Sequence, residues 1–300
     1  MKANAKNFVN DQMPLVVNLA PTGMVPTRDM SPHVPLQPKE IVRAVVDAAN
    51  TGITMVHLHA RDEHDRPTYH KEIYARIIGG IREHHPDLII GVSCSGRDFG
   101  GFEERADVLN LSGDLRPDMA SLTLSSMNFA RQASINTPDM IRRLIDRMLE
   151  NQILPEFEIF DLGMTNYASY LIDTIGMQGP FYANIILGNV AGAQASFSGV
   201  AAITSALPDE TIWGLGGMGA AQIPVSALAA ATAPAVRIGL EDNLWMDRQR
   251  RQFASNQGMV ERIHALAAHA DRSVMQPAEL RSLLNLRGLD TAAATGPASS

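Results

Sequence analysis

The chain has 300 residues, 45% of them hydrophobic, which is enough to bury one large core or two ordinary ones. A net charge of −7 without a Lys/Arg block argues against general affinity for nucleic acid or anionic membranes. No apolar run reaches the roughly 18 to 20 residues that span a bilayer, and the first residues lack a secretion signal, so we expect a soluble, cytoplasmic protein.

Apolar runs of strand length alternate with helix-length amphipathic segments along nearly the whole chain, which is the pattern of repeated βα units. Several of these runs are apolar at successive positions, as strands covered on both faces must be. We predict eight strands, at residues 15–19, 55–59, 88–93, 119–124, 154–160, 181–187, 211–215 and 235–238.

The segments between these strands carry apolar residues three and four apart, as helices packed on a barrel do. The first predicted helix, residues 38–50, begins at Pro38 and is followed by Gly52, residues suited to the first turn and to a left-handed cap. Further helices are predicted at residues 71–85, 138–151, 167–175, 223–233, 256–270 and 277–285.

Eight parallel strands can form a closed barrel or an open doubly wound sheet. An open sheet that bound a dinucleotide would carry a glycine-rich turn after an early strand, and that motif is missing. The glycine-rich stretch 214–219 follows the seventh strand, where it is either a tight turn or a phosphate contact. We therefore predict an α/β fold, a (β/α)8 TIM barrel with a C-terminal helical extension, as a single domain over residues 1–290, with residues 291–300 disordered.

Two histidines end the second predicted strand, in VHLHARD. Residues two apart share one face of a strand, so His57 and His59 project together, about 7 Å apart along the strand. Two imidazoles there suit Zn²⁺, although two core histidines bonded to neighbouring strands would show the same pattern. The single cysteine, Cys94, cannot form an internal disulfide, so any metal must be held mainly by His and carboxylate.

A third ligand is available after the eighth strand, where Arg237, Glu241 and Asp242 cluster in VRIGLEDNLW. In a closed barrel the eighth strand adjoins the first, and the second is one further round, so Glu241 can reach the histidine pair. Two histidines and one carboxylate leave a coordination position open, as in catalytic zinc sites. The alternative is a surface acidic pair that caps the next helix.

Five stretches of the chain resemble, in the same order, the β-keto acid cleavage enzymes, whose best-known branch cleaves 3-keto-5-aminohexanoate. They are APTGMVPTRDMSPHVPLQPKEI, MVHLHARDEHDRPTYH, PDMASLTLSSMNF, PEFEIFDLGM and VRIGLEDNLW. The resemblance implies a zinc-dependent (β/α)8 barrel that converts a β-keto acid and acetyl-CoA into acetoacetate and a new acyl-CoA. It also implies a homo-oligomer, commonly a tetramer.

The resemblance assigns roles to residues by position. It implies that His57, His59 and Glu241 hold the metal, and that Arg237 and Asp242 are the pair with acid/base and charge-stabilising roles. Our hypothesis from the sequence is that Asp242, beside Arg237, removes a proton from the acetyl methyl of acetyl-CoA.

Four further positions are predicted to bind the substrate. By resemblance three of them are Ser93, Ser126, where the best-known branch has threonine, and Asp161, and the fourth is Val25. Val25 replaces a glutamate of the amino-acid-cleaving branch, and this loss disfavours a substrate with an ammonium group. Val25 and Met24 suggest an uncharged substrate tail, while Arg28 keeps an anionic tail open.

Two other functions stay open at this point. One is a metal-dependent aldolase or hydrolase on the same barrel that does not use CoA. The other is a metabolite-binding barrel without catalysis, against which the intact set of metal-ligand and acid/base residues argues.

Overall fold

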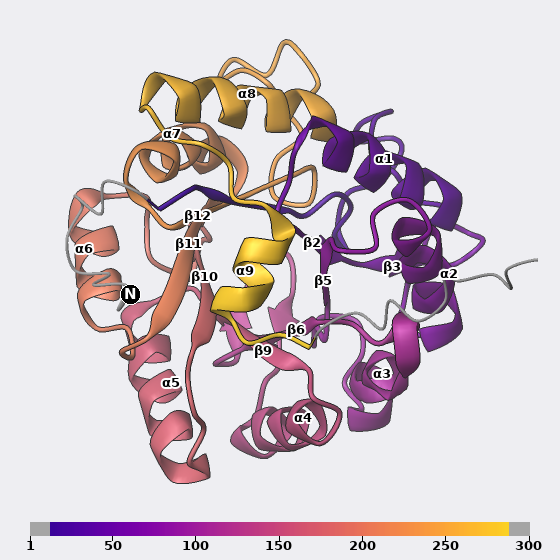
Figure 1. Ribbon diagram of the computed structural model, residues 1–300, viewed down its shortest axis with the longest axis vertical. Helices are drawn as coiled ribbons and strands as arrows, with labels where there is room; N and C mark the ends of the chain where they lie inside the picture. The colour runs from indigo at the N-terminus through magenta and orange to yellow at the C-terminus, as the bar shows by residue number, and fades with distance from the viewer. Residues whose placement is uncertain (1–12, 288–300) are drawn as a thin grey trace, which may run out of the picture.

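The computed structural model describes residues 13–287 and contains a closed barrel of eight parallel strands (Figure 1). Around the barrel the order is β1-β12-β11-β10-β9-β6-β5-β2, so the last barrel strand pairs with the first. The barrel strands are β1 Val16–Leu19, β2 Met55–Leu58, β5 Ile89–Val92, β6 Met119–Thr123, β9 Leu154–Ile159, β10 Phe181–Leu187, β11 Thr211–Gly217 and β12 Ala235–Ile238.

The predicted TIM barrel with a C-terminal helical extension is confirmed. All eight predicted strands are present, and their ends differ from the prediction by no more than two residues. The largest difference is in β11, which continues to Gly217 because it stays paired with Leu187 of β10. The predicted tail, residues 291–300, lies outside the described residues, and the single-domain boundaries stay a prediction.

Helices cover the outside of the barrel (Figure 1). The seven predicted helices are α1 Pro38–Thr51, α2 Lys71–Arg82, α4 Pro138–Glu150, α5 Leu162–Ile175, α7 Gln222–Thr232, α8 Asn256–His269 and α9 Pro277–Leu283. The start of α5 was predicted five residues too late, because Asp161 caps the helix by accepting a hydrogen bond from the Met164 amide at 3.0 Å.

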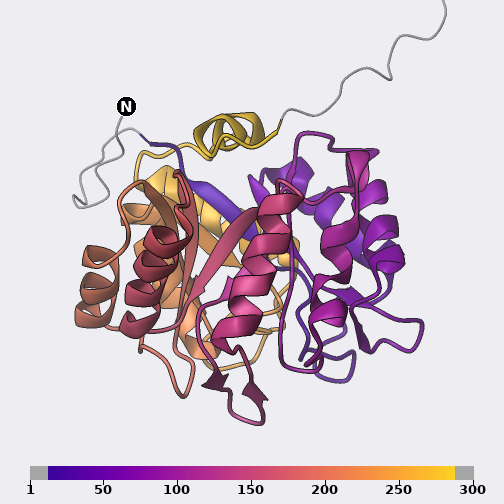
Figure 2. The same cartoon turned by 90° about the horizontal axis from the view of Figure 1, so that it is seen from below.

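Several short elements were not predicted from the sequence. They are α3 Phe102–Ala106, α6 Phe197–Ser205, the 3-10 turns η1 Asp107–Asn110, η2 Gly113–Leu115 and η3 Gly219–Ala221, and the hairpin strands β3 Ala60–Arg61, β4 Pro67–Thr68, β7 Met127–Asn128 and β8 Ala133–Ser134. Figure 2 shows the β7–β8 hairpin projecting from the end of the barrel opposite α9. Both hairpins follow the carboxyl ends of barrel strands, where barrel enzymes carry their active sites.

The helix α9 closes the amino end of the barrel (Figures 1 and 2). Leu280 and Leu284 are buried in one cluster with Val16 and Tyr182 of the barrel strands. Arg281 of α9 also donates to buried Asp118 at 2.7 Å, which ties the helix to the start of β6. The amino end is therefore filled, and a large cavity lies at the carboxyl end of the strands.

Within residues 13–287, no helix combines the length and the apolar character needed to cross a bilayer.

Candidate active site

The strand β2 brings the two predicted histidines to the inside of the barrel. Leu58 packs in the outer apolar core, and His57 and His59 on either side of it are turned inward, 1% and 7% exposed. Opposite His57 on β5 stands Gly91, and a Cβ there would lie 3.1 Å from Glu156 Oε2. This glycine leaves room for the carboxylate that His57 contacts.

A buried carboxylate orients His57. The Nδ1 atom of His57 lies 3.0 Å from Glu156 Oε2, while Glu156 Oε1 accepts hydrogen bonds from the amides of Asn18, at 3.1 Å, and Asn184. With two donors on one oxygen, the other oxygen is free to accept the Nδ1 proton of His57. This leaves the lone pair on Nε2, which points at His59, the arrangement of histidines that bind metals.

The pKa shifts of Glu156 and His57 agree with a proton on His57 Nδ1 that faces an ionised carboxylate. Burial raises the pKa of Glu156, but the charge and hydrogen bond of His57 and the charge of Arg237 outweigh burial, so the pKa is lowered. Burial lowers the pKa of His57, yet the neighbouring Glu156 reverses the shift and the pKa is raised. Glu156 therefore stays ionised beside His57.

Three donor atoms converge at the carboxyl end of β2. His57 Nε2 lies 3.3 Å from His59 Nε2, which lies 3.3 Å from Glu241 Oε1, and one ligand atom from each residue lies within 4.8 Å of the other two. Metal bonds of about 2.0 to 2.1 Å in a tetrahedron place ligand atoms about 3.3 Å apart. The second oxygen of Glu241 is buried with no hydrogen-bond partner among the described residues. The three residues therefore fit a divalent cation.

Glycine makes room for Glu241. Gly23 has φ of +71°, and a Cβ there would lie 2.5 Å from Glu241 Cγ. Any side chain at this position would push Glu241 away from the histidines and strain the backbone.

Arg237 and Asp242 form a forked ion pair beside these ligands. Arg237 Nε donates to Asp242 Oδ2 at 2.9 Å and Nη2 donates to Oδ1 at 3.3 Å, while Nη2 also donates to Glu241 Oε1 at 2.8 Å. The remaining Nη1 has no hydrogen-bond partner among the described residues and lies 3.9 Å from Glu158 Oε1. Glu158 in turn accepts from Thr123 Oγ1 at 2.6 Å.

The two adjacent carboxyls differ in proton affinity. Burial raises the pKa of Asp242, and the charge of Glu241 adds to it, so the opposing charge of Arg237 does not bring it back. Burial also raises the pKa of Glu241, but the charges of His59 and Arg237 outweigh burial and hold that pKa well below its usual range. Glu241 is therefore suited to bind a cation, and Asp242 to take up a proton.

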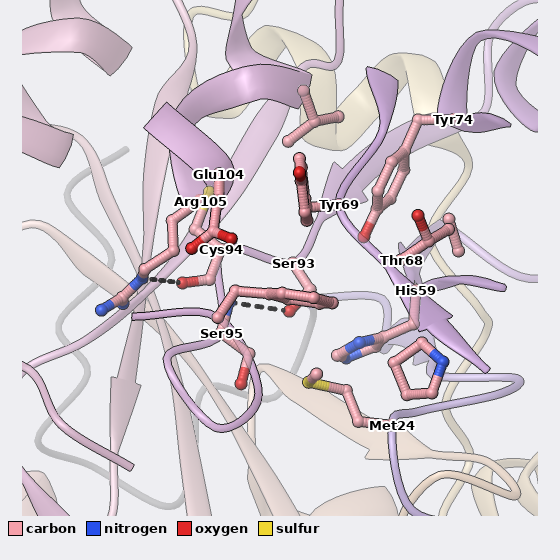
Figure 3. Close-up of a pocket in the computed structure, with 14 residues that line it drawn as sticks. Met24, His59, Thr68, Tyr69, Tyr74, Ser93, Cys94, Ser95, Glu104 and Arg105 are labelled. Atoms are coloured by element: carbon pink, nitrogen blue, oxygen red, sulfur yellow. Dashed lines mark hydrogen bonds between the residues drawn. The ribbon is translucent and has the colours of Figure 1, made fainter. Parts of the chain in front are cut away.

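A cavity of about 850 Å³ opens above these groups. Polar residues at its base include His59, Ser93, Glu158, Arg237, Glu241 and Asp242, and apolar residues of its walls include Met24, Val25, Phe129, Phe160, Ile186 and Trp245. A side pocket of about 20 Å³, with room for about one water, adjoins it and shares Met24, His59, Ser93 and Ser95 (Figure 3).

A sequence profile described as beta-keto acid cleavage enzyme matches residues 14–286. The chain belongs to this family. The resemblance stated from the sequence is thereby confirmed, and the chain is an enzyme of the β-keto acid cleavage class.

Curated relatives match over nearly their full lengths. The chain is 32% identical over 273 residues to 3-keto-5-aminohexanoate cleavage enzyme of Acetoanaerobium sticklandii, covering 91% of this chain and 98% of that protein. It is 32% identical over 281 residues to 3-oxoadipate:acetyl-CoA acetyltransferase of Cupriavidus necator, covering 92% and 96%.

Among solved structures, the apo structure of ObcA aligns with a TM-score of 0.72 at 19% identity, over 85% of this chain and 66% of that chain. The chain thus spans about two thirds of the length of ObcA, and at this identity the similarity shows the fold alone.

The structure brings together five of the residues singled out in this family member, His57, His59, Arg237, Glu241 and Asp242. Ser93 and Val25 line the cavity together with His59, Arg237, Glu241 and Asp242. Two other predicted substrate residues do not line it: Ser126 is exposed and accepts from the Asn136 amide at 2.8 Å, and Asp161 caps α5.

Five further polar residues that contact the site or its neighbours were not predicted from the sequence, namely Asn18, Thr123, Glu156, Glu158 and Asn184. One signal was present in β9, where PEFEI places two glutamates at alternate positions of a strand with apolar neighbours. Charged residues two apart in such a strand point into the barrel together.

Proposed function

We propose that the protein condenses a β-keto acid with acetyl-CoA and cleaves the product to acetoacetate and a new acyl-CoA, with a divalent metal held by His57, His59 and Glu241. The observation that carries this proposal is the convergence of these ligands beside the Arg237–Asp242 pair at the base of one cavity. The relatives named for cleavage of a keto acid and for transfer from acetyl-CoA support the reaction type.

Zinc is the metal we propose, because two imidazole nitrogens and one carboxylate oxygen are ligands that Zn²⁺ prefers. When bound, the ion would act as a Lewis acid toward the keto group of the substrate. Glu156 would keep His57 in the tautomer that presents Nε2.

The carbon balance of the reaction fixes where the proton must leave. Acetoacetate contains the acetyl group of acetyl-CoA and the carboxyl-bearing methylene of the keto acid, so a bond must form between that methylene and the acetyl carbonyl carbon. We therefore propose this methylene as the site of deprotonation, and not the acetyl methyl that we proposed from the sequence. Asp242, whose buried carboxyl has a raised pKa, is the proposed base.

The remaining steps balance without another reactant. The carbanion attacks the acetyl thioester and CoA leaves as thiolate. The thiolate adds to the keto carbon of the substrate, the bond between that carbon and the methylene carbon breaks, and the new acyl-CoA forms. The electron pair left on the methylene carbon takes the proton back from Asp242, which completes acetoacetate.

Arg237 has two proposed tasks. Its forked contact holds Asp242 in place, and its unpartnered Nη1 supplies a donor and a fixed positive charge near the enolate that develops. The charges of Asp242 and Glu241 outweigh burial and raise its pKa well above the usual value, so it stays cationic throughout.

Two experiments test the proposal. Purified protein is assayed with a panel of β-keto acids, with and without acetyl-CoA, for acetoacetate and new acyl-CoA, and metal content is measured in parallel. We expect both products only when acetyl-CoA is present. Cleavage that proceeds equally without acetyl-CoA would point to the aldolase or hydrolase alternative, and no turnover of any keto acid would favour a binding protein.

The cytoplasmic location and the tetramer stay predictions. Cell fractionation can check the location, and light scattering can check the oligomeric state.

A further inference from the structure

Among the arginines of the cavity wall that make no ion pair within the described residues, Arg97 is half-buried, whereas Arg131 and Arg250 are exposed. Arg97, in the loop between β5 and α3, lines the cavity, and its guanidinium carbon lies 3.4 Å from the ring centre of Phe129. Within residues 13–287, no carboxylate oxygen lies within 4.0 Å of this guanidinium and no side-chain hydrogen bond leaves it. Stacking on the ring occupies one face of the guanidinium and leaves the donors along its edge free.

The structure holds this guanidinium firmly. Phe129 is fixed by an edge-on contact with Phe160, at 5.8 Å between ring centres. The loop that carries Arg97 is fixed by buried Arg105, which donates to the carbonyl of Cys94 at 2.9 Å (Figure 3) and to Asn136 Oδ1 at 2.7 Å. Arg97 is therefore preorganised, and a ligand would bind it without ordering a mobile side chain.

Arg97 lies in a partly desolvated part of the cavity wall. The side chain is half-buried, and burial lowers its pKa, while the charges of Glu241, Glu158 and Asp242 act in the opposite direction. A desolvated cation without a partner is costly unless a ligand neutralises it. Asp98 and the exposed Arg131 and Arg250 line the cavity as well, and Asp98 Oδ1 accepts a hydrogen bond from Gln132 at 3.4 Å.

The cation suggested by the sequence, Arg28, is differently placed. It is paired with Glu40 at 3.0 Å and lies 3.6 Å from Asp65, and it does not line the cavity. An anionic substrate tail would thus meet Arg97 and not Arg28.

We propose that Arg97 binds a carboxylate at the far end of the keto acid, so that the preferred substrates are β-keto diacids. The inference rests on the proposed function and refines its substrate class. A carboxylate fits the free edge of a guanidinium with two parallel hydrogen bonds, and the apolar walls formed by Met24, Val25 and Ile186 would cover the chain between the two acidic ends. An anion could also come from the phosphates of CoA, and the test separates the two sources.

The test compares two six-carbon substrates that differ in one carboxylate, 3-oxoadipate and 3-oxohexanoate. We expect the wild type to prefer the diacid in kcat/KM, and Arg97→Met to lower that preference roughly 10- to 100-fold through KM for the diacid. Arg97→Lys should retain part of it. KM for acetyl-CoA should not change. Arg28→Met is the matched control, because it removes a cation outside the cavity and should leave the preference as it is.

Binding of each keto acid is measured by calorimetry in the absence of acetyl-CoA, where no turnover can occur. Tighter binding of the diacid to the wild type, lost in Arg97→Met, supports the proposal. Equal binding of the two acids overturns it, and so does an Arg97→Met variant that raises only KM for acetyl-CoA, which assigns the cation to CoA phosphate. If no keto acid yields acetoacetate, the proposed function fails, and the binding comparison still decides the role of Arg97.

Discussion

Glu156 is the residue on which the orientation of the metal ligand His57 depends. It contacts His57 directly and is itself held by the amides of Asn18 and Asn184, although none of these three residues faces the cavity. The two histidines could be predicted from sequence because their spacing is local. Their orientation could not, because its determinants come from three other strands, β1, β9 and β10, that meet only in the folded barrel.

Replacing Glu156 should weaken metal binding without removing a ligand. In Glu156→Gln the ionised acceptor for His57 Nδ1 is lost, so we expect metal affinity to fall about 10- to 100-fold. Competition with a fluorescent chelator measures this. Glu158→Gln is the comparison, since Glu158 is on the same strand but contacts Thr123 and should leave metal affinity unchanged. Unchanged affinity in Glu156→Gln would contradict the orienting role.

Asp242→Asn should abolish most turnover while the metal stays bound. Loss of a positioned base costs about 10²- to 10⁴-fold in rate, and the three ligands are not altered. The measurement is kcat with metal content determined on the same sample. Asp47→Asn, an exposed carboxylate on α1, serves as control and should keep wild-type kcat. Near-normal kcat in Asp242→Asn with full metal would mean that another group takes the proton.

Val25 offers a direct test of substrate specificity. Val25→Glu would place a carboxylate in the cavity wall, so we expect kcat/KM for an amino-bearing keto acid, relative to a neutral one, to rise about 10-fold or more. Val25→Gln has the same shape without the charge and should not raise this ratio. A similar rise in both variants would show that polarity, and not charge, is recognised.

At the scale of elements, prediction succeeded where a run was long enough to show a period. The barrel strands and the helix α1 carry clear apolar patterns, and their bounds were nearly correct. The two-residue strands of the β7–β8 hairpin are too short for any period, and α6 is rich in small residues that give no amphipathic signal. The site depends on such elements, since Phe129 belongs to that hairpin.

The helix α9 should be necessary for stability. Leu280 is fully buried against the amino end of the barrel, so Leu280→Ala should lower the free energy of unfolding by about 2 to 5 kcal/mol. Denaturant titration measures it. Leu283→Ala lies in the same helix with 47% of its side chain exposed and should change stability by less than about 0.5 kcal/mol. Equal effects would show that α9 does not pack as described.

At the scale of the whole molecule, closure of the barrel creates the site. His57 and Glu241 are 184 residues apart in the chain, and they meet because β1 pairs with both β2 and β12. This meeting could be predicted once eight strands were counted. The unpartnered Arg97 could not, because its isolation depends on where every carboxylate of the folded chain lies.

Removing the metal should affect both activity and stability. The ligands come from opposite ends of the chain, so an ion that binds only the folded protein stabilises it by about 2.7 kcal/mol at a concentration 100 times its Kd. We expect chelation to abolish turnover and lower Tm, and Zn²⁺ to restore both. Full activity after the metal content has fallen to background would refute the metal-dependent mechanism.

The filled amino end also limits how reactants enter the cavity and how products leave it. Because α9 covers the amino end of the barrel, the cavity formed by the described residues is closed at its base, where the metal-ligating residues lie. Both reactants would then enter, and both products would leave, through the opening at the carboxyl end of the barrel. An acyl-CoA still bound in that opening would keep the next β-keto acid from reaching the base of the cavity.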